Sequence, residues 1–135
     1  MKTINNLKIT ALLLVVALAL TGCRLNDDRD FDQIIGHWVS DYTYDGYRTY
    51  DAWDVEEYYF HRNGDGEYSY VDEWGVWVTY RFTWDTYRDQ TIELRFPDRT
   101  GYSYVQYYYE WDRDGDLLLS TDRNMREYMA FRYMR

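Results

Sequence analysis

The sequence predicts an all-β domain of about eight antiparallel strands in a meander. Aromatic residues make up 21% of the chain and include 17 tyrosines, and aromatic side chains favour strands. The chain holds one proline and no segment with a sustained helical period. Gly, Asp and Asn turn signals recur about every 8–14 residues, which is typical of a sandwich or barrel. We expect an up-and-down barrel, which has no open edges; an open β-sandwich is the alternative.

Turn signals such as Asp45-Gly46 and Asn63-Gly64 separate the expected strands, because these residues tolerate the positive φ of tight hairpins. The strands are expected over residues 35–44, 52–61, 67–72, 76–84, 91–96, 102–111, 116–120 and 128–134. Alternation within them predicts an inner face rich in Trp, Tyr and Phe. We therefore expect a mostly filled interior with a shallow mouth. Residues 27–33 are expected to form a short turn that closes one end.

The predicted inner face comes from strands with a clear period of two. Its members are Val76, Val78, Tyr80, Phe82, Trp84, Ile92, Leu94, Phe96, Val105, Tyr107, Tyr109, Trp111, Met129, Phe131 and Tyr133.

Residues 1–22 are predicted to be an export signal. The first eight residues carry Lys2 and Lys8 and no acidic residue. The apolar run that follows, residues 9–20, is too short for a membrane-spanning helix. The next four residues, Leu-Thr-Gly-Cys ending at Cys23, resemble the lipobox of bacterial lipoproteins. This resemblance implies cleavage before Cys23 and its acylation, with palmitate among the acyl chains. An ordinary secretory signal followed by a stray cysteine is the alternative.

The predicted mature chain consists of an acidic tether, residues 23–33, and one domain, residues 34–135. It carries 13 arginines against 24 acidic residues, a net charge of −11. Such a chain should not bind nucleic acid or an anionic membrane surface through its charge, so the lipid must supply the membrane attachment. Its single cysteine excludes an internal disulfide.

The start of the tether bears on localisation. Residue 24 is Arg rather than the Asp that often retains lipoproteins at the inner membrane. We therefore expect a lipid anchor in the outer membrane, with the domain facing the periplasm or the cell exterior. The acidic residues after Cys23 resemble the surface-export signals of some Gram-negative lipoproteins, and a solvated tether explains them equally well.

Short motifs in the domain resemble the lipocalin and lipocalin-like families over residues 34–134. They are Gly36-His37-Trp38, the hairpin segment from Phe60 to Glu67, and Asp116 to Ser120. The resemblance implies a lipocalin-like barrel with a binding role. It also implies structural roles for Gly36, for Trp38 at the barrel base, and for Arg132 lying over the Trp38 ring.

Catalysis is not expected. No serine lies in a G-x-S-x-G motif, and the predicted mature chain has no lysine. His37 and His61 are its only histidines, which makes a zinc site unexpected. Glu56 and Glu57 are adjacent in a strand and should point to opposite faces. The Asp-rich segment 112–116 is better explained as a hairpin turn than as a calcium loop, and we expect no metal and no cofactor.

Outward-facing aromatic residues are the candidate ligand-binding residues. The residues expected on the outer face are Tyr58, Tyr68, Tyr70, Trp77, Tyr102, Tyr104 and Tyr108. We single out Trp77, Tyr102, Tyr104 and Tyr108, because Tyr and Trp are enriched at recognition surfaces. Cross-strand tyrosine pairs that stabilise the sheet are the alternative. The sequence thus predicts a lipid-anchored envelope protein that binds a small molecule or glycan. A protein-interaction or inhibitor module, accessory to an outer-membrane complex, is the second hypothesis.

Overall fold

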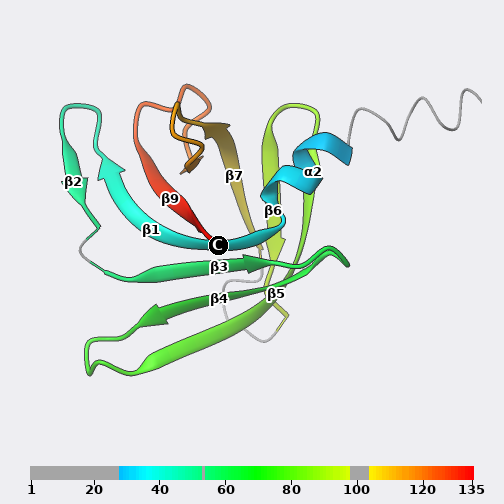
Figure 1. The fold of residues 1–135 in the computed structure, drawn as a ribbon, viewed down its shortest axis with the longest axis horizontal. Helices are drawn as coiled ribbons and strands as arrows, with labels where there is room; N and C mark the ends of the chain where they lie inside the picture. The colour runs from blue at the N-terminus through cyan, green and yellow to red at the C-terminus, as the bar shows by residue number, and fades with distance from the viewer. Residues whose placement is uncertain (1–27, 53, 98–103) are drawn as a thin grey trace, which may run out of the picture.

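The computed structural model describes residues 28–52, 54–97 and 104–135 as one antiparallel sheet that closes into a barrel (Figure 1). One helix precedes it. The elements are α2 (Asp28–Ile34), β1 (Gly36–Tyr44), β2 (Thr49–Asp51), β3 (Glu56–Phe60), β4 (Asp65–Val71), β5 (Trp77–Tyr87), β6 (Thr91–Arg95), β7 (Tyr104–Trp111), β8 (Leu117–Ser120) and β9 (Tyr128–Met134). The predicted all-β meander is confirmed.

Closure occurs between the first and last strands. β1 pairs with β9 from His37–Met134 to Tyr44–Tyr128, and a β-bulge interrupts the ladder between Ser40 and Tyr42. Every other strand of the barrel pairs with its neighbour in sequence. The closed barrel is therefore confirmed over the open sandwich, and closure removes the exposed sheet edges at which chains aggregate.

The second predicted strand, residues 52–61, is found only as β3, and a separate short strand, β2, precedes it at Thr49–Asp51. β2 pairs with the end of β1, and β3 pairs with its start, so the two short strands share one position in the barrel. Ser40 stabilises the break, because its hydroxyl accepts a hydrogen bond from the amide of Glu56 and donates one to the carbonyl of Asp54. The barrel thus has eight strand positions.

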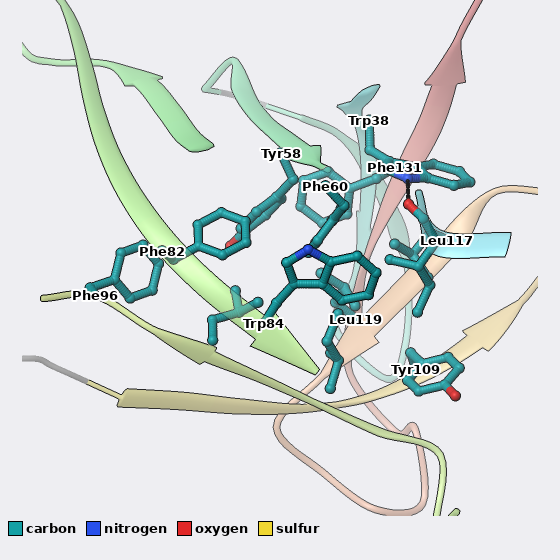
Figure 2. Packing of buried hydrophobic residues seen from close by; sticks show 13 residues of the cluster. Trp38, Tyr58, Phe60, Phe82, Trp84, Phe96, Tyr109, Leu117, Leu119 and Phe131 are labelled. Atoms are coloured by element: carbon teal, nitrogen blue, oxygen red, sulfur yellow. Dashed lines mark hydrogen bonds between the residues drawn. The ribbon is translucent and has the colours of Figure 1, made fainter. Parts of the chain in front are cut away.

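The half of the barrel interior nearer to helix α2 is filled by side chains (Figure 2). Phe82, Trp84, Leu94 and Phe131, all on the predicted inner face, are at most 5% exposed. The rings of Phe82 and Trp84 pack edge to face against Phe60, whose ring centroid lies 5.0 Å from that of Trp84. This half of the interior has no room for a deep ligand cavity, as the aromatic-rich inner face predicted.

Helix α2 covers one end of the barrel, in the segment for which the sequence predicts a short turn. Phe31 stacks on Trp84 with ring centroids 4.1 Å apart and planes at 8°. The Tyr109 hydroxyl donates a hydrogen bond to Asp30 at 2.9 Å. The indole of Trp38 donates to the carbonyl of Ile34 at 2.7 Å (Figure 2). Part of the predicted tether therefore packs on the barrel, and its residues 23–27 lie outside the described residues.

The two ends of the barrel differ, and we name them the base and the mouth. The base is covered by α2, to which the β3–β4 turn is joined by an Arg62–Asp32 ion pair of 3.1 Å. The mouth is the opposite end, where β1 ends and β9 begins and where the β4–β5 turn lies (Figure 1). Within the described ranges, no helix is long and apolar enough to cross a membrane.

Candidate ligand-binding site

A ladder of polar aromatic side chains lies above the packed core, on the way to the mouth. Tyr58 is 4% exposed, and its ring lies 4.8 Å from that of Tyr68. The expectation that these two rings face outward is wrong, because Tyr58 shares the inner face with Phe60 and Tyr68 packs against the core. The Tyr68 hydroxyl donates a hydrogen bond to the carboxylate of Glu56 at 3.0 Å. On its other side, the Tyr107 side chain acts on the Tyr58 hydroxyl and contributes to raising its pKa. The interior thus changes from apolar at the base to polar near the mouth.

Burial raises the pKa of two ionisable groups of this ladder, those of Glu56 and Tyr58. Loss of solvent raises the pKa of the Glu56 carboxyl; the Tyr68 hydrogen bond opposes that rise, and the negative charge of Asp54 adds to it. Burial likewise raises the pKa of the Tyr58 hydroxyl well above its ordinary value. The tyrosine therefore stays neutral near pH 7, and the ladder offers hydroxyl groups together with one carboxyl group.

A cavity of about 220 Å³ opens at the mouth. Three inner-face residues, Tyr107, Leu119 and Met129, come from β7, β8 and β9, and Thr43 joins them from β1. The rim residues are Tyr44, Asp45, Ser120, Thr121, Glu127 and Tyr128. The mouth pocket, defined by these ten residues, spans the seam at which the barrel closes.

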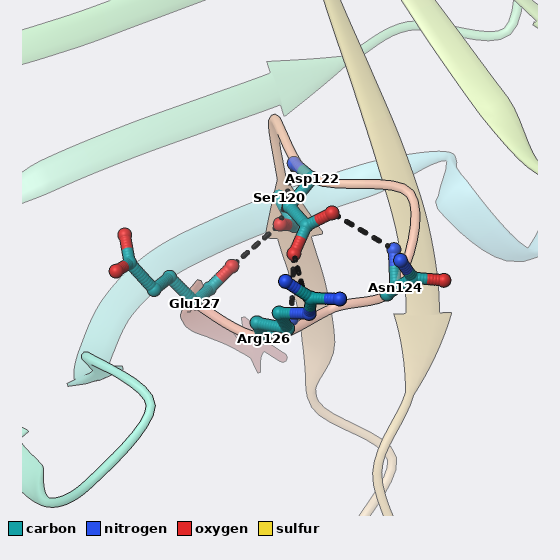
Figure 3. Close-up of polar contacts among 5 residues, drawn as sticks. All are labelled: Ser120, Asp122, Asn124, Arg126 and Glu127. Atoms are coloured by element: carbon teal, nitrogen blue, oxygen red, sulfur yellow. Dashed lines mark hydrogen bonds and ion pairs between the residues drawn. The ribbon is translucent and has the colours of Figure 1, made fainter.

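The loop after β8 holds one side of the mouth pocket in place (Figure 3). The Ser120 hydroxyl donates to the carbonyl of Glu127 and accepts a hydrogen bond from the amide of Asp122. The Asp122 carboxylate accepts from the amides of Asn124 and Arg126, and it forms an ion pair of 4.0 Å with the Arg126 side chain. These contacts position Glu127 and the following Tyr128 at the rim.

Two other hollows lie on the outside of the barrel. The larger, about 450 Å³, lies along the outer residues Asp65, Glu67 and Arg81 and reaches Pro97, the last described residue before the gap at 98–103. The smaller, about 190 Å³, lies between β5 and β6 beside a Glu93–Arg95 hydrogen bond of 2.7 Å. Each outer hollow is lined by one inner-face side chain, Phe82 in the larger and Trp84 in the smaller, whereas three inner-face side chains line the mouth pocket, so we take the mouth pocket as the candidate site.

Comparison with known proteins supports the same architecture. No protein-family model matches the sequence, and no curated protein matches it. A solved lipocalin-like protein from Bacteroides uniformis matches with a TM-score of 0.59 and 14% identity, covering 76% of this chain and 99% of that one. The fold is lipocalin-like. An uncharacterized protein from Bacteroides eggerthii matches with a TM-score of 0.54 and 13% identity, covering 74% of this chain and 98% of that one.

The predicted ligand-binding residues do not converge on the lipocalin-like barrel. Trp77 lies at the start of β5 and is 53% exposed, whereas Tyr104 and Tyr108 lie on the outer face of β7. Register places Tyr104 at the level of Thr83, about 20 Å along β5 from Trp77. Tyr102 lies outside the described residues. These side chains therefore do not form one site.

The residues with predicted structural roles lie near the base. Gly36 has a φ of 137°, and a side chain there would collide with the Tyr133 ring. Trp38 is 3% exposed. Its ring packs edge to face with Tyr133 at 5.1 Å, while Arg132 lies outside the barrel, 3.9 Å from Asp41. The expected placement of Arg132 is thus corrected: Tyr133 is the residue opposite Trp38, and adjacent strand residues point to opposite faces.

Sequence reasoning missed the rim of the mouth pocket. Tyr44 and Tyr128 are paired across the closing seam, so neither strand alone identifies them. The bulge after Ser40 also shifts the alternation of β1, and Thr43 rather than Tyr44 lies opposite the inner-face residue Met129. The sequence held one indication of this rim: Tyr44 and Tyr128 both lie next to turns that fall at the same end of an up-and-down barrel.

Proposed function

We propose that this protein is a non-catalytic binding protein of the cell envelope, held by a lipid on Cys23, that takes a small ligand into its mouth pocket. The observation that carries the proposal is the floor of that pocket, which consists of inner-face side chains above a packed core. A ligand can therefore enter only the upper part of the barrel. At about 220 Å³, the pocket is smaller than the usual 300–1,000 Å³ of small-molecule sites, which suits one sugar ring or one head group.

The geometry of the acidic residues supports a role without catalysis. Glu56 points inward to Tyr68, whereas the carboxylate of Glu57 lies 3.0 Å from the His37 ring nitrogen. The two carboxylates therefore do not face each other as an acid–base pair. Among the residues that the structure describes, no group of three His, Cys, Asp or Glu could hold a metal ion.

Methionine methyl NMR tests the proposed site directly. The full chain, labelled at its methionine methyl groups, is titrated with methyl glycosides, amines, carboxylic acids and simple aromatic alcohols. We expect at least one probe to shift the Met129 signal saturably, while Met134, at the base end of β9, stays unchanged.

Two threonine variants separate the mouth pocket from the rest of the surface. Thr43→Phe places a ring in the pocket and should abolish the shift. Thr79→Phe makes the same change on the exposed face of β5 and should preserve it. If no probe moves Met129, or if both variants bind alike, the pocket is not the ligand site.

A second candidate function, docking of a protein partner, rests on the β4–β5 turn. Trp74 is 78% exposed and Val76 57%, and Trp77 lies beside them. The turn is rigid, because the Asp72 carboxylate accepts hydrogen bonds from the amides of Trp74 and Val76. Exposed tryptophans on a fixed turn are typical of interaction hot spots.

Pull-down with the membrane-anchored protein tests this second function. The wild-type bait should enrich one envelope protein, and a Trp74→Ala/Trp77→Ala bait should not recover it. Equal recovery with both baits contradicts this function.

A further inference from the structure

We propose that the base of the barrel sits on the surface of a zwitterionic lipid bilayer through a tyrosine belt, formed by Tyr59, Tyr87 and Tyr133. This inference rests on the proposed function, because the lipid on Cys23 is what brings the bilayer to the base. The lipid supplies the attachment, and the belt adds a contact between the protein itself and the lipid head groups.

The tyrosine belt lies at the base ends of three strands. Each strand is antiparallel to its neighbours, so β3, β5 and β9 all end at the base. Tyr59 and Tyr133 are the next-to-last residues of β3 and β9, and Tyr87 is the last residue of β5. They are 43%, 46% and 44% exposed, respectively. Tyrosine combines an apolar ring with a polar hydroxyl, and it is therefore enriched at the level of lipid head groups.

Neighbouring rings hold two members of the belt in place. The Tyr59 ring contacts the rings of His37 and His61, with centroids 5.6 and 4.5 Å away. The Tyr133 ring packs against Trp38, at the start of β1 beside which β9 ends (Figure 1). A contact made by rings that are already fixed loses little conformational entropy. The belt is thus prepared for a surface that meets the base.

The predicted tether leaves little chain between the lipid and the base. Residues 24–27 lie between Cys23 and Asp28, the first residue of α2, and α2 covers the base. A short link of this kind holds two surfaces together at an effective concentration in the millimolar range. A contact too weak to hold a free domain on a membrane can therefore form once the lipid on Cys23 is inserted.

Charge at the base indicates which bilayer surface fits. The β7–β8 turn lies at the same end of the barrel and carries Asp112, Asp114 and Asp116. The predicted mature chain as a whole has a net charge of −11. These charges are repelled by an anionic surface, whereas the neutral tyrosine hydroxyls are not. The belt therefore fits zwitterionic head groups, and anionic lipid should weaken the contact.

A fluorescent label on α2 tests the contact. Gln33 is exposed on α2, and Cys23 is the one cysteine of the chain, so Gln33→Cys supplies a single free thiol once Cys23 is acylated. The full acylated chain, labelled there with nitrobenzoxadiazole, is added to phosphatidylcholine vesicles. The emission of this label moves to shorter wavelength when water is excluded from it. We expect such a shift, a smaller one when phosphatidylglycerol is included, and recovery of the shift at high salt.

Matched tyrosine variants locate the contact. Tyr59→Ser/Tyr87→Ser removes two rings of the belt and should lose most of the shift, while the lipid still holds the protein on the vesicles. Tyr47→Ser/Tyr104→Ser removes two exposed tyrosines away from the base and should keep the shift. The comparison of the two lipids needs no tyrosine substitution, so it tests the contact even if the belt variant fails to fold.

The outcomes separate this inference from the proposed function. A chain that leaves the vesicles lacks the anchor, which contradicts the anchoring and the belt contact together. A chain that stays on the vesicles with the same shift in both double variants, or with no shift, would overturn the belt contact and leave the anchor in place. An equal shift with and without phosphatidylglycerol would overturn the preference for zwitterionic lipid. The titration of the mouth pocket is independent of all these results.

Discussion

At the scale of single residues, Glu56 places a carboxyl group inside the barrel, in the half nearer to the mouth. It is partly buried, it accepts the Tyr68 hydrogen bond, and its pKa is raised chiefly by burial. Sequence alone placed Glu56 and Glu57 on opposite faces through the period of a strand. It could not say which of the two is internal, because aromatic residues follow on both faces of the strand, Tyr58 and Phe60 on one and Tyr59 on the other.

Glu56→Gln should stabilise the protein at neutral pH. The glutamine oxygen can still accept the Tyr68 hydrogen bond, while the buried charge is removed. A raised folded-state pKa means that the Glu56 contribution to stability is complete below the unfolded pKa of about 4.3 and is lost as pH rises through the folded value. Urea denaturation should therefore give the variant a larger unfolding free energy near pH 7 and little difference below about pH 4. An equal gain in the outward-facing Glu57→Gln would contradict this assignment.

Helix α2 shows how a short element can depend on tertiary contacts. Its seven residues are too few for a stable isolated helix, so packing on the barrel must hold it. The sequence predicted closure of one end by this segment, yet not a helix, because the stacking of Phe31 on Trp84 joins residues far apart in the chain. The bulge after Ser40 and the separate short strand β2 were likewise not predicted.

Phe31→Ala should destabilise the protein by about 1–3 kcal/mol, since it removes a partly buried ring stacked on the core. Asp32→Ala, in the same helix, removes only an exposed ion pair and should cost less than about 0.5 kcal/mol. Thermal unfolding of both variants beside the wild type measures the difference. Similar melting temperatures for the two variants would mean that α2 does not stabilise the barrel.

At the scale of the whole molecule, the meander was predictable, whereas its closure and the ligand site were not. Strand alternation and turn spacing identified a meander with an aromatic interior, but the number of strands alone does not decide between a barrel and an open sandwich. The mouth pocket instead depends on where two distant turns meet, beside Asp45 and beside Glu127. No local pattern encodes that meeting, and the outward aromatic residues that local reasoning favoured lie apart.

The proposed lipid anchor is tested at the scale of the whole molecule. Cys23→Ala removes the thiol that acylation requires, so this variant should lack acyl chains and leave the membrane fraction. Fractionation followed by mass spectrometry of the intact protein measures both properties. Arg24→Ala keeps the thiol and should remain acylated and membrane-bound. A Cys23→Ala protein that stays with the membrane like the wild type would show that something other than this cysteine anchors it.

The position of α2 at the base sets the direction from which a tethered barrel meets its ligands. From Cys23 to Asp28 the chain can reach at most about 17 Å, even fully extended. A lipid on Cys23 would thus keep the base close to the bilayer and turn the mouth toward the water. Cargo would then arrive and leave through the aqueous phase and never by lateral diffusion out of the lipid. Any protein that exchanges cargo with this barrel would have to contact it at the mouth, on the side that faces away from the membrane.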